Sequence, residues 1–468
     1  MNFKEEILSR IENGICEVIG LGVSNLPLCR WLIGKGAKVI GRDIKDESKI
    51  PCASELCGLG VTLVTGEGYL SGLGKKDPEH TVIFRAPGMR PDIKEIADAV
   101  LCGALLTSEM ELFFELAKAP VIGITGSDGK TTTTTLIGKM LEEEFKGTQR
   151  KVYVGGNIGR PLLPIVEEMT ENDISVVELS SFQLMTMKRS PHRAVITNIT
   201  PNHLNWHTDM EEYAEAKRNI CNFAPCERVV LNAENGRTAA IADELKIHTA
   251  RFSSKRMPKG EAAYICDGAI MYSDGEREER IVDIADIVIP GMHNVENYMA
   301  AILATRGLVS SESVRRVATS FSGVEHRCEL VRIKDGVRYY NSSIDSSPTR
   351  TAAALSNFKT KPIVICGGYD KNIPFEPLAE TLCERAKAVV LTGATMEKIK
   401  TALISCEKYE KCGLSVIEKK DFFEAVLAAS EYAESGDTVI LSPACASFDV
   451  FSNFEERGKK FKEIVNDL

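Results

Sequence analysis

Short apolar runs alternate with amphipathic stretches along the whole chain. The runs have the length and the aliphatic, β-branched content of buried strands, as in residues 16–22, 120–125, 174–180, 193–199, 361–368 and 437–443. The stretches between them are long enough for helices and carry apolar residues at helical spacing. Strands and helices that alternate in this way predict parallel sheets with helical crossovers, and therefore an α/β fold.

Two changes in the pattern predict three domains. A helix ends and a strand begins near residues 117–120, and a helical stretch over 294–320 precedes strand-like residues 330–341. We therefore expect domains at residues 1–118, 119–322 and 323–468. The polar, turn-rich residues 253–291 predict short antiparallel strands inside the middle domain.

Composition and charge narrow the class of protein. The 468 residues carry a net charge of −9, which argues against a general nucleic-acid binder because phosphate neutralisation needs a basic face. No apolar run reaches the roughly 18 residues of a membrane span, and the first residues, MNFKEEILSRIENG, lack the apolar core of a signal peptide. We expect a cytoplasmic protein that uses neither nucleic acid nor membrane.

A glycine-rich turn lies between a predicted strand and a predicted helix. Such a turn exposes backbone N–H groups at the positive end of the helix, where they bind phosphate oxygens. The strict G-x-x-x-x-G-K-[ST] pattern is not met, because Ile124 stands where its first glycine would fall. The strand–turn–helix context still predicts an ATP site, built from Gly126, Ser127, Asp128, Gly129, Lys130, Thr131 and Thr132.

Within this site Lys130 is expected to reach the β- and γ-phosphates and Thr131 to ligate Mg²⁺. Glu178 ends a predicted strand, where a carboxylate commonly holds Mg²⁺ in nucleotide sites. His203 follows another strand end, although its local pattern alone favours a surface imidazole or one that only supports a ligand. Lys217 lies on a predicted helix, and its local pattern alone indicates a solvated lysine.

The residues so far support an ATP·Mg²⁺ phosphoryl-transfer enzyme, and two other classes compete with it. One is an NAD-dependent oxidoreductase, because Gly20 and Gly22 follow a strand and Asp43 lies about 20 residues further on. Its third glycine is replaced by Asn25, which weakens that fingerprint. The other is a nucleotide-dependent switch protein. A cofactor absorbance spectrum would test the first, and dependence of ATP turnover on small co-substrates would separate an enzyme from a switch.

A series of motifs in fixed order resembles the Mur ligases, the ATP-dependent amino-acid ligases of peptidoglycan synthesis. The motifs are ITGSDGKTTTTTL, GGNIGRP, VVELSSFQL, TNITPNHLNWH, YAEAKRNI, GMHNVENYMAA, VEHRCE, ICGGYDK and SPACASFDVFSNFEERG. They cover nearly the whole chain. The last, at residues 442–458, is most similar to members that add D-glutamate to UDP-N-acetylmuramoyl-L-alanine.

The resemblance implies a Rossmann-like UDP-binding domain, a central P-loop ATPase domain with a parallel sheet, and a Rossmann-like C-terminal domain. It implies that the Gly20–Asn25 turn holds the UDP end of the substrate, not a dinucleotide. It also implies that an acyl phosphate forms from ATP. We expect a monomer. The UDP-substrate positions that it matches are Val23, Ser24, Asp43, Gly88, Asn157 and His203.

The resemblance also assigns nucleotide and metal positions. Asn294, Asn297 and Arg327 match ATP contacts. Lys217 matches a lysine that the family carries as a carbamate, which reverses its local interpretation as a solvated side chain. Two Mg²⁺ sites are then expected, with ligands from Thr131, Glu178, His203 and carbamylated Lys217. The catalytic residues would be Lys130, His203 and Lys217.

The C-terminal domain matches the D-glutamate pocket and contains one departure from the family. Lys371, Ser447, Phe448 and Phe454 match pocket positions, whereas Asp449 is expected to face away. In place of the usual N-D-S-K-A-T the chain reads NSSIDS over residues 341–346, so Asp345 is expected to supply the missing carboxylate to ATP. Another Mur-type or folylpolyglutamate-type amino-acid ligase is the alternative activity.

Overall fold

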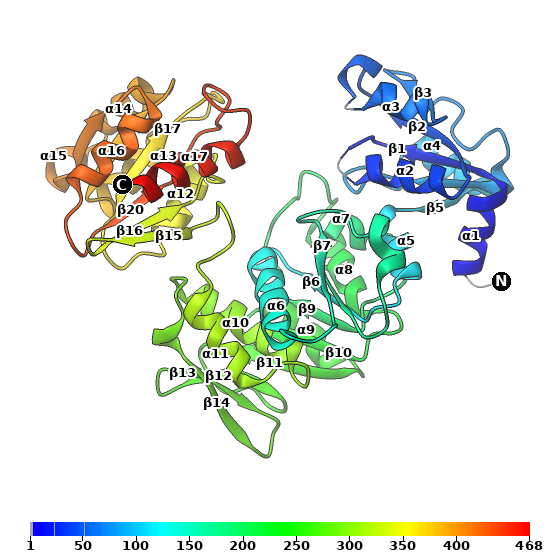
Figure 1. Cartoon of the computed structure of the whole chain (residues 1–468), viewed down its shortest axis with the longest axis horizontal. Helices are drawn as coiled ribbons and strands as arrows, with labels where there is room; N and C mark the ends of the chain where they lie inside the picture. The colour runs from blue at the N-terminus through cyan, green and yellow to red at the C-terminus, as the bar shows by residue number, and fades with distance from the viewer. Residues whose placement is uncertain (1–2, 23, 51) are drawn as a thin grey trace. The chain divides into compact units, whose positions relative to one another are not determined.

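The computed structural model describes residues 3–22, 24–50 and 52–468 (Figure 1). The chain forms two compact units. One contains residues 1–284 and 295–317, and the other contains residues 285–294 and 318–468. Within the described residues the strands assemble into three sheets, two in the first unit and one in the second.

The first sheet is parallel throughout and has the strand order β3-β2-β1-β4-β5. This is the order of a Rossmann-like sheet, in which the chain crosses over after β3 and continues on the other side of β1. Its strands are β1 (Ile15–Ile19), β2 (Lys38–Asp43), β3 (Thr62–Thr65), β4 (Thr81–Phe84) and β5 (Leu105–Thr107).

The second sheet has the order β14-β13-β12-β11-β10-β9-β6-β8-β7. It is parallel from β7 to β12, and β12, β13 and β14 form an antiparallel extension. Its strands are β6 (Val121–Thr125), β7 (Val152–Gly156), β8 (Ile174–Glu178), β9 (Arg193–Ile196), β10 (Arg228–Asn232), β11 (His248–Ser253), β12 (Ala262–Cys266), β13 (Ala269–Ser273) and β14 (Glu278–Asp283).

The third sheet has the order β15-β16-β20-β17-β18-β19. Only the hairpin β15–β16 is antiparallel. Its strands are β15 (Glu329–Lys334), β16 (Val337–Asn341), β17 (Ile363–Gly367), β18 (Ala388–Thr392), β19 (Ser415–Glu418) and β20 (Thr438–Leu441).

Helices connect the strands. In the first unit they are α1 (Phe3–Asn13), α2 (Asn25–Gly34), α3 (Ala53–Gly58), α4 (Lys94–Leu101), α5 (Glu109–Leu116), α6 (Lys130–Glu144), α7 (Ser181–Leu184), α8 (Met210–Arg218) and α9 (Gly236–Glu244). Helix α10 (Met292–Thr305) belongs to both units, and α11 (Ser311–Ser320) follows it. The second unit contains α12 (Pro348–Leu355), α13 (Glu376–Arg385), α14 (Met396–Ile404), α15 (Tyr409–Cys412), α16 (Phe422–Tyr432) and α17 (Phe454–Asp467).

Apolar burial explains the grouping of the sheets. One cluster of buried side chains runs through the first unit, from Ile7 in α1 to Ala242 in α9, and it includes Phe113 and Phe114 of α5. Two further clusters cover the third sheet, one built on Leu378 and the other on Phe461. Burying an aromatic side chain stabilises a fold by roughly 2–3 kcal/mol, so α5 contributes strongly to joining the first two sheets.

The sequence-based strands are confirmed, as are the antiparallel strands within residues 253–291. The single helical stretch expected over residues 294–320 is instead two helices. Gly307 lies two residues after the end of α10 and has φ of +80°, a conformation that ends a helix and that glycine adopts at little cost. Among the described residues, no helix combines the length and the apolar composition needed to cross a membrane.

Candidate functional site

The turn between β6 and α6 has the backbone of a phosphate loop. Gly126 and Gly129 have φ of +149° and +80°. A Cβ at Gly126 would lie 1.9 Å from the Thr197 hydroxyl, and one at Gly129 would lie 2.4 Å from the Asn297 amide oxygen. Both positions therefore require glycine, which explains the residue pattern of the turn.

The loop is tied to the end of the neighbouring strand β9. Asn198 accepts hydrogen bonds from the backbone N–H of Ser127 and, through its side chain, of Asp128, at 2.9 and 3.0 Å. The Ser127 hydroxyl lies 2.9 Å from the Tyr213 hydroxyl of α8. The loop is thus held at the carboxyl ends of parallel strands, where open α/β sheets bind ligands.

Two lysines lie at this loop. Lys130 Nζ donates to the carbonyls of Gly126 and Ser127, both at 2.9 Å. Lys217 Nζ donates to the Gly126 carbonyl at 2.7 Å and lies 4.7 Å from the centre of the Tyr213 ring. The side chain of Lys217 is fully buried, and burial together with the charge of Lys130 lowers its pKa well below the usual range for lysine.

Glu178 ends β8 inside the fold. It is 1% exposed; its Oε1 accepts a hydrogen bond from the Asn157 side chain at 2.9 Å, and its Oε2 has no hydrogen-bond partner. A buried carboxylate oxygen without a donor is costly unless a cation satisfies it. The sequence-predicted residues Glu178 and Asn157 are therefore brought together in a form that suits a hard cation.

His203 has a left-handed backbone, with φ of +55°, and its ring packs edge-on against Phe182 at 5.0 Å. Partial desolvation, together with the charge of Lys130, lowers the pKa of His203. The imidazole is therefore neutral near pH 7 and able to accept a proton or bind a cation.

The predicted ATP contacts on α10 are one helical turn apart. Asn297 is buried, and its amide oxygen accepts a hydrogen bond from the Thr133 hydroxyl of α6 at 3.2 Å, beside the phosphate loop. Asn294 donates to the Pro290 carbonyl at 2.6 Å in the second unit. Arg327 is exposed at the start of the C-terminal sheet domain and interacts electrostatically with Asp345.

The predicted UDP residues lie mainly around the first sheet. Asp43 ends β2, and its two carboxylate oxygens accept hydrogen bonds from the backbone N–H groups of Leu21 and Lys45, at 2.7 and 2.9 Å. Ser24 is the N-cap of α2, Gly88 is exposed in the loop after β4, and Val23 lies outside the described residues.

The geometry does not favour the dinucleotide alternative. Each carboxylate oxygen of Asp43 accepts one backbone hydrogen bond and keeps a second lone pair for a ligand hydroxyl, so Asp43 alone does not separate a dinucleotide from a UDP-linked ligand. Asn25 fills the third glycine position with a side chain that is 2% exposed and donates to the Ile19 carbonyl at 3.0 Å. A third glycine would let the helix pack closely against the strand. Here the Asn25 amide fills that space.

The predicted amino-acid pocket lies at the carboxyl ends of β17 and β20. Lys371 is exposed after β17, and its Nζ lies 3.5 Å from the Ser346 carbonyl. Ser447 is 2% exposed, whereas the next residue, Phe448, is 63% exposed and packs edge-on against Tyr369. The structure thus brings a cation, a hydroxyl and an aromatic pair to one end of the sheet.

Two other residues near this pocket make contacts within the protein. Phe454, at the start of α17, packs edge-on against the His326 ring at 6.1 Å. Asp449 accepts a hydrogen bond from the Ala394 backbone N–H at 3.1 Å, just before α14. That backbone contact stabilises the carboxylate near a helix N-terminus.

Asp345 is buried beneath the turn that follows β16. It is 6% exposed, and its carboxylate accepts a hydrogen bond from the Ser442 hydroxyl at 2.8 Å. Burial raises the pKa of Asp345 to about 6. Ser342, which stands where the family has an acidic residue, is also buried and accepts a hydrogen bond from the Cys328 backbone N–H at 3.2 Å.

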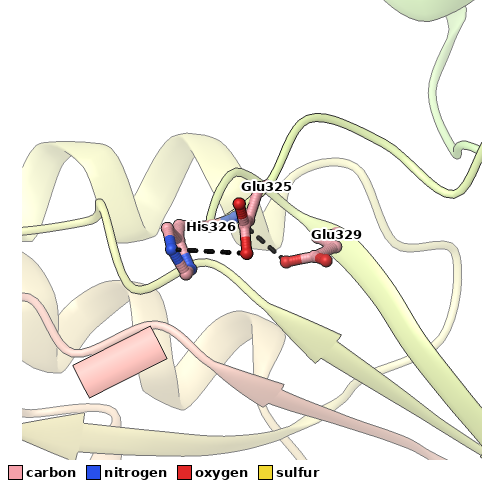
Figure 2. A group of neighbouring side chains, drawn as sticks. All are labelled: Glu325, His326 and Glu329. Carbon is pink, nitrogen blue, oxygen red and sulfur yellow. Dashed lines mark hydrogen bonds and ion pairs between the residues drawn. The ribbon is translucent and has the colours of Figure 1, made fainter. Parts of the chain in front are cut away.

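Glu325, His326 and Glu329 form the cluster in the described part of the chain whose side chains have the spacing of metal ligands (Figure 2). Lys462 forms ion pairs with both carboxylates, at 3.1 and 2.5 Å. Asn341 donates to Glu329 at 3.1 Å and lies 2.9 Å from His326 Nδ1. A lysine of α17 and an amide of β16 already satisfy this cluster, so its contacts anchor α17 to β15.

Several residues around the site were not identified from the sequence. Tyr213 and Asn198 hold the phosphate loop, and neither belongs to a local pattern that predicts this role. Arg457 is 2% exposed and donates to the carbonyls of Ser343, Cys445 and Ala446 at 2.8–3.1 Å, which fixes the backbone just before Ser447. Its partners are carbonyls and not carboxylates, so charge patterning could not reveal it.

Comparison with known proteins agrees with this geometry. Two family models match the chain, the Mur ligase middle domain over residues 124–305 and the glutamate ligase domain of Mur ligases over residues 326–445. A UDP-N-acetylmuramoylalanine–D-glutamate ligase of Acetivibrio thermocellus is 47% identical over the full length of both chains. A ligase of the same name from Clostridium perfringens is 48% identical over 96% of each chain.

Solved structures share the fold at low identity. A pseudomurein peptide ligase type C from Methanothermus fervidus has a TM-score of 0.51 at 19% identity, covering 97% of this chain and 100% of that one. FolC of E. coli in complex with DHPP and ADP has a TM-score of 0.54 at 15% identity, covering 77% and 93%. The full-length identity to the curated relatives shows that the chain belongs to the Mur ligase family.

Proposed function

We propose that this protein is an ATP-dependent, ADP-forming ligase that joins D-glutamate to UDP-N-acetylmuramoyl-L-alanine in peptidoglycan precursor synthesis. The relatives that carry this name match the chain from end to end. The observation that carries the proposal is the grouping of Lys130, buried Lys217 and the unpartnered Glu178 oxygen around one phosphate loop. A dinucleotide enzyme or a switch protein would not need this combination.

The proposed reaction proceeds in two steps. The substrate carboxylate attacks the γ-phosphorus of ATP, a P–O bond to ADP breaks, and an acyl phosphate forms. The amine of D-glutamate then attacks the acyl carbon, loses a proton, and displaces inorganic phosphate. Two anions must meet in the first step, and the ammonium of Lys130 with the N–H groups of residues 126–132 would offset their repulsion.

The residues at the site fit bound Mg²⁺. Glu178 Oε2 is buried without a donor, and the Thr131 hydroxyl and the neutral His203 ring are the other expected ligands. Mg²⁺ bound there would withdraw charge from the phosphate oxygens. We expect two such sites, the second using Lys217 after modification.

We further propose that Lys217 is carbamylated. A neutral amine adds to carbon dioxide: its nitrogen forms a bond to carbon, and the released proton passes to solvent. Burial and the charge of Lys130 favour the neutral amine that this step requires. The product is an anion with two oxygens, which suits a hard cation better than an ammonium does.

For the second substrate, we propose that Lys371 pairs with a carboxylate of D-glutamate and that Ser447 and its neighbouring backbone supply neutral donors. Phe448 and Phe454 would complete the pocket. His203 and the phosphate group are both chemically able to accept the proton of the attacking amine. ATP is supplied in the cytoplasm, so we place the reaction there. We also expect a monomer, which light scattering after size-exclusion chromatography would test.

The direct test is release of ADP and phosphate by the purified protein. We expect release to require ATP, Mg²⁺, the UDP-linked substrate and D-glutamate together. Release that needs no amino acid would favour a nucleotide switch. Release with a folate-type substrate and L-glutamate, but not with the UDP-linked substrate, would favour a folylpolyglutamate-type ligase instead.

A further inference from the structure

The loop after β4 is hydrogen-bonded to the segment that precedes α8. The Trp206 indole N–H donates to the Gly88 carbonyl at 2.7 Å, and Arg90 donates to the Trp206 carbonyl at 2.8 Å. The Arg90 guanidinium also lies 5.2 Å from the Trp206 ring and binds both oxygens of Glu212, at 3.1 and 3.0 Å. These contacts join residues more than 100 positions apart in the sequence.

Glu212 is the centre of this contact. Besides Arg90, it accepts hydrogen bonds from the Thr208 backbone N–H at 2.9 Å and from His207 Nδ1 at 3.2 Å. These donors, Arg90 first among them, lower the pKa of Glu212 to about 2. Such a carboxylate stays ionised and orients whatever it binds.

His207 connects Glu212 to residues that contact the phosphate loop. Because its Nδ1–H points at Glu212, its Nε2 accepts the hydrogen bond of the Ser181 hydroxyl, at 2.9 Å. Its ring is 2% exposed and packs edge-on against Tyr213 at 5.2 Å. Tyr213 in turn contacts the Ser127 hydroxyl, and its ring lies 4.7 Å from Lys217 Nζ.

The contacts that start at Arg90 and Glu212 therefore divide at His207 into two series, and both end at residues proposed to act in catalysis or beside them. One reaches Ser181, three residues after Glu178. The other reaches Ser127 and Lys217 through Tyr213. Every step is a hydrogen bond, an ion pair or a ring contact within the first unit.

We propose that Arg90 and Glu212 are positioning residues that couple the substrate loop at Gly88 to the phosphate loop and Lys217. Neither touches a reacting atom. Their ion pair sets the orientation of His207 and, through it, of Tyr213. This inference rests on the proposed function, because it takes Gly88 to lie at the UDP-linked substrate.

A double-mutant cycle tests the coupling. Arg90→Ala, Glu212→Gln and the double variant are assayed for kcat and KM with each substrate, and their melting temperatures are recorded. We expect each single variant to lower kcat/KM for the UDP-linked substrate by about 10-fold or more, with the KM for D-glutamate within about twofold of wild type. The double variant should lose little beyond the worse single variant, because residues that act as one unit are not additive.

The chain supplies a matched control. Glu211 precedes Glu212 in the same helical turn and pairs with Arg237 at 3.0 Å on the exposed surface. Glu211→Gln and Arg237→Ala should keep wild-type kinetics, although Glu211→Gln removes an equal charge from the start of α8. Arg90→Lys, which keeps a cation but loses the two-pronged contact, should give an intermediate kcat/KM and a folded protein.

Three results would overturn the coupling. The losses in kcat/KM could multiply in the double variant, the Glu211 control could lose as much as the Glu212 variant, or the losses could simply follow the melting temperature. Wild-type kinetics in folded Arg90 and Glu212 variants would do the same while leaving the proposed function intact. Absence of ligase activity in the wild-type protein would instead remove the proposed function itself.

Discussion

Lys130 and Lys217 donate to the same oxygen, the carbonyl of Gly126, at 2.9 and 2.7 Å. Lys130 comes from the first turn of α6 and Lys217 from the last turn of α8. Two ammonium groups on one carbonyl repel each other, and Lys217 is also buried. Loss of a proton from Lys217 removes this repulsion, and the neutral amine that results is the form that reacts with carbon dioxide.

Lys217→Ala should therefore be nearly inactive. Removing an anionic ligand for Mg²⁺ from the transition state should cost about 10³-fold in kcat. A short-chain carboxylic acid added to the variant should restore part of the activity, because it returns a carboxylate to the same cavity. Carbon-13 NMR of the wild-type protein in labelled bicarbonate should show a carbamate signal that Lys217→Ala lacks. Full activity of Lys217→Ala without additives would exclude this role.

Lys130→Ala should abolish turnover and leave the fold intact. We expect its ammonium to contact the phosphates of bound ATP, and loss of one charge-assisted contact in the transition state should lower kcat by at least about 10³-fold. Circular dichroism and the melting temperature serve as controls for folding. Near-normal turnover in a folded Lys130→Ala protein would remove the loop from the mechanism.

The sequence reveals those parts of the site that depend on strand ends. Glu178 and the glycine-rich turn follow apolar runs, so the parallel arrangement of β8 and β6 predicts that they meet. Contacts that depend on distant pairs had no such signal. Arg90 pairs with Glu212, which lies 122 positions away in the sequence. Arg457 binds backbone carbonyls, which every residue has. The break at Gly307 was missed because the residues on both sides of it favour helix.

The altered segment at residues 341–346 can be tested by kinetics. We expect Asp345→Ala to raise the KM for ATP several-fold, because Asp345 is the carboxylate closest to the position where the family has one. Ser342→Ala should change the KM for ATP little, since the Ser342 hydroxyl already serves the Cys328 backbone. Steady-state kinetics with ATP as the varied substrate would rank the two. The reverse order would show that Asp345 does not take the ATP role.

Asp345 should also influence stability with pH. Its pKa is about 6 in the folded protein and about 3.8 when exposed, so the folded state binds the proton more tightly. The protein should therefore lose stability as pH rises from about 4 through 6, as the buried carboxyl ionises.

Asp345→Asn imitates the neutral carboxyl and still accepts the Ser442 hydrogen bond. At pH 7.5 this variant should exceed wild type in free energy of unfolding by about 3 kcal/mol, and near pH 4 the difference should fall below about 1 kcal/mol. Urea denaturation at both pH values measures it. A variant that is less stable than wild type at pH 7.5 would mean that the charged carboxylate is satisfied in the fold.

The choice of amino acid tests the central claim most directly. In the proposed pocket Lys371 would pair with a side-chain carboxylate and Ser447 would supply a neutral donor, while the Asp449 carboxylate accepts a hydrogen bond from the Ala394 backbone. A pocket for two carboxylates should reject L-lysine, which has only one, because the donors of the pocket would remain unpaired. L-glutamate and diaminopimelate carry two carboxylates, so we expect the configuration at Cα to exclude the first and the distal ammonium to exclude the second. Ligation is measured with UDP-N-acetylmuramoyl-L-alanine and D-glutamate, L-glutamate, L-lysine or diaminopimelate in turn. We predict product with D-glutamate and at least about 10³-fold lower kcat/KM with the others. Preference for L-lysine or diaminopimelate would contradict the proposed activity, although not the membership of the Mur ligase family.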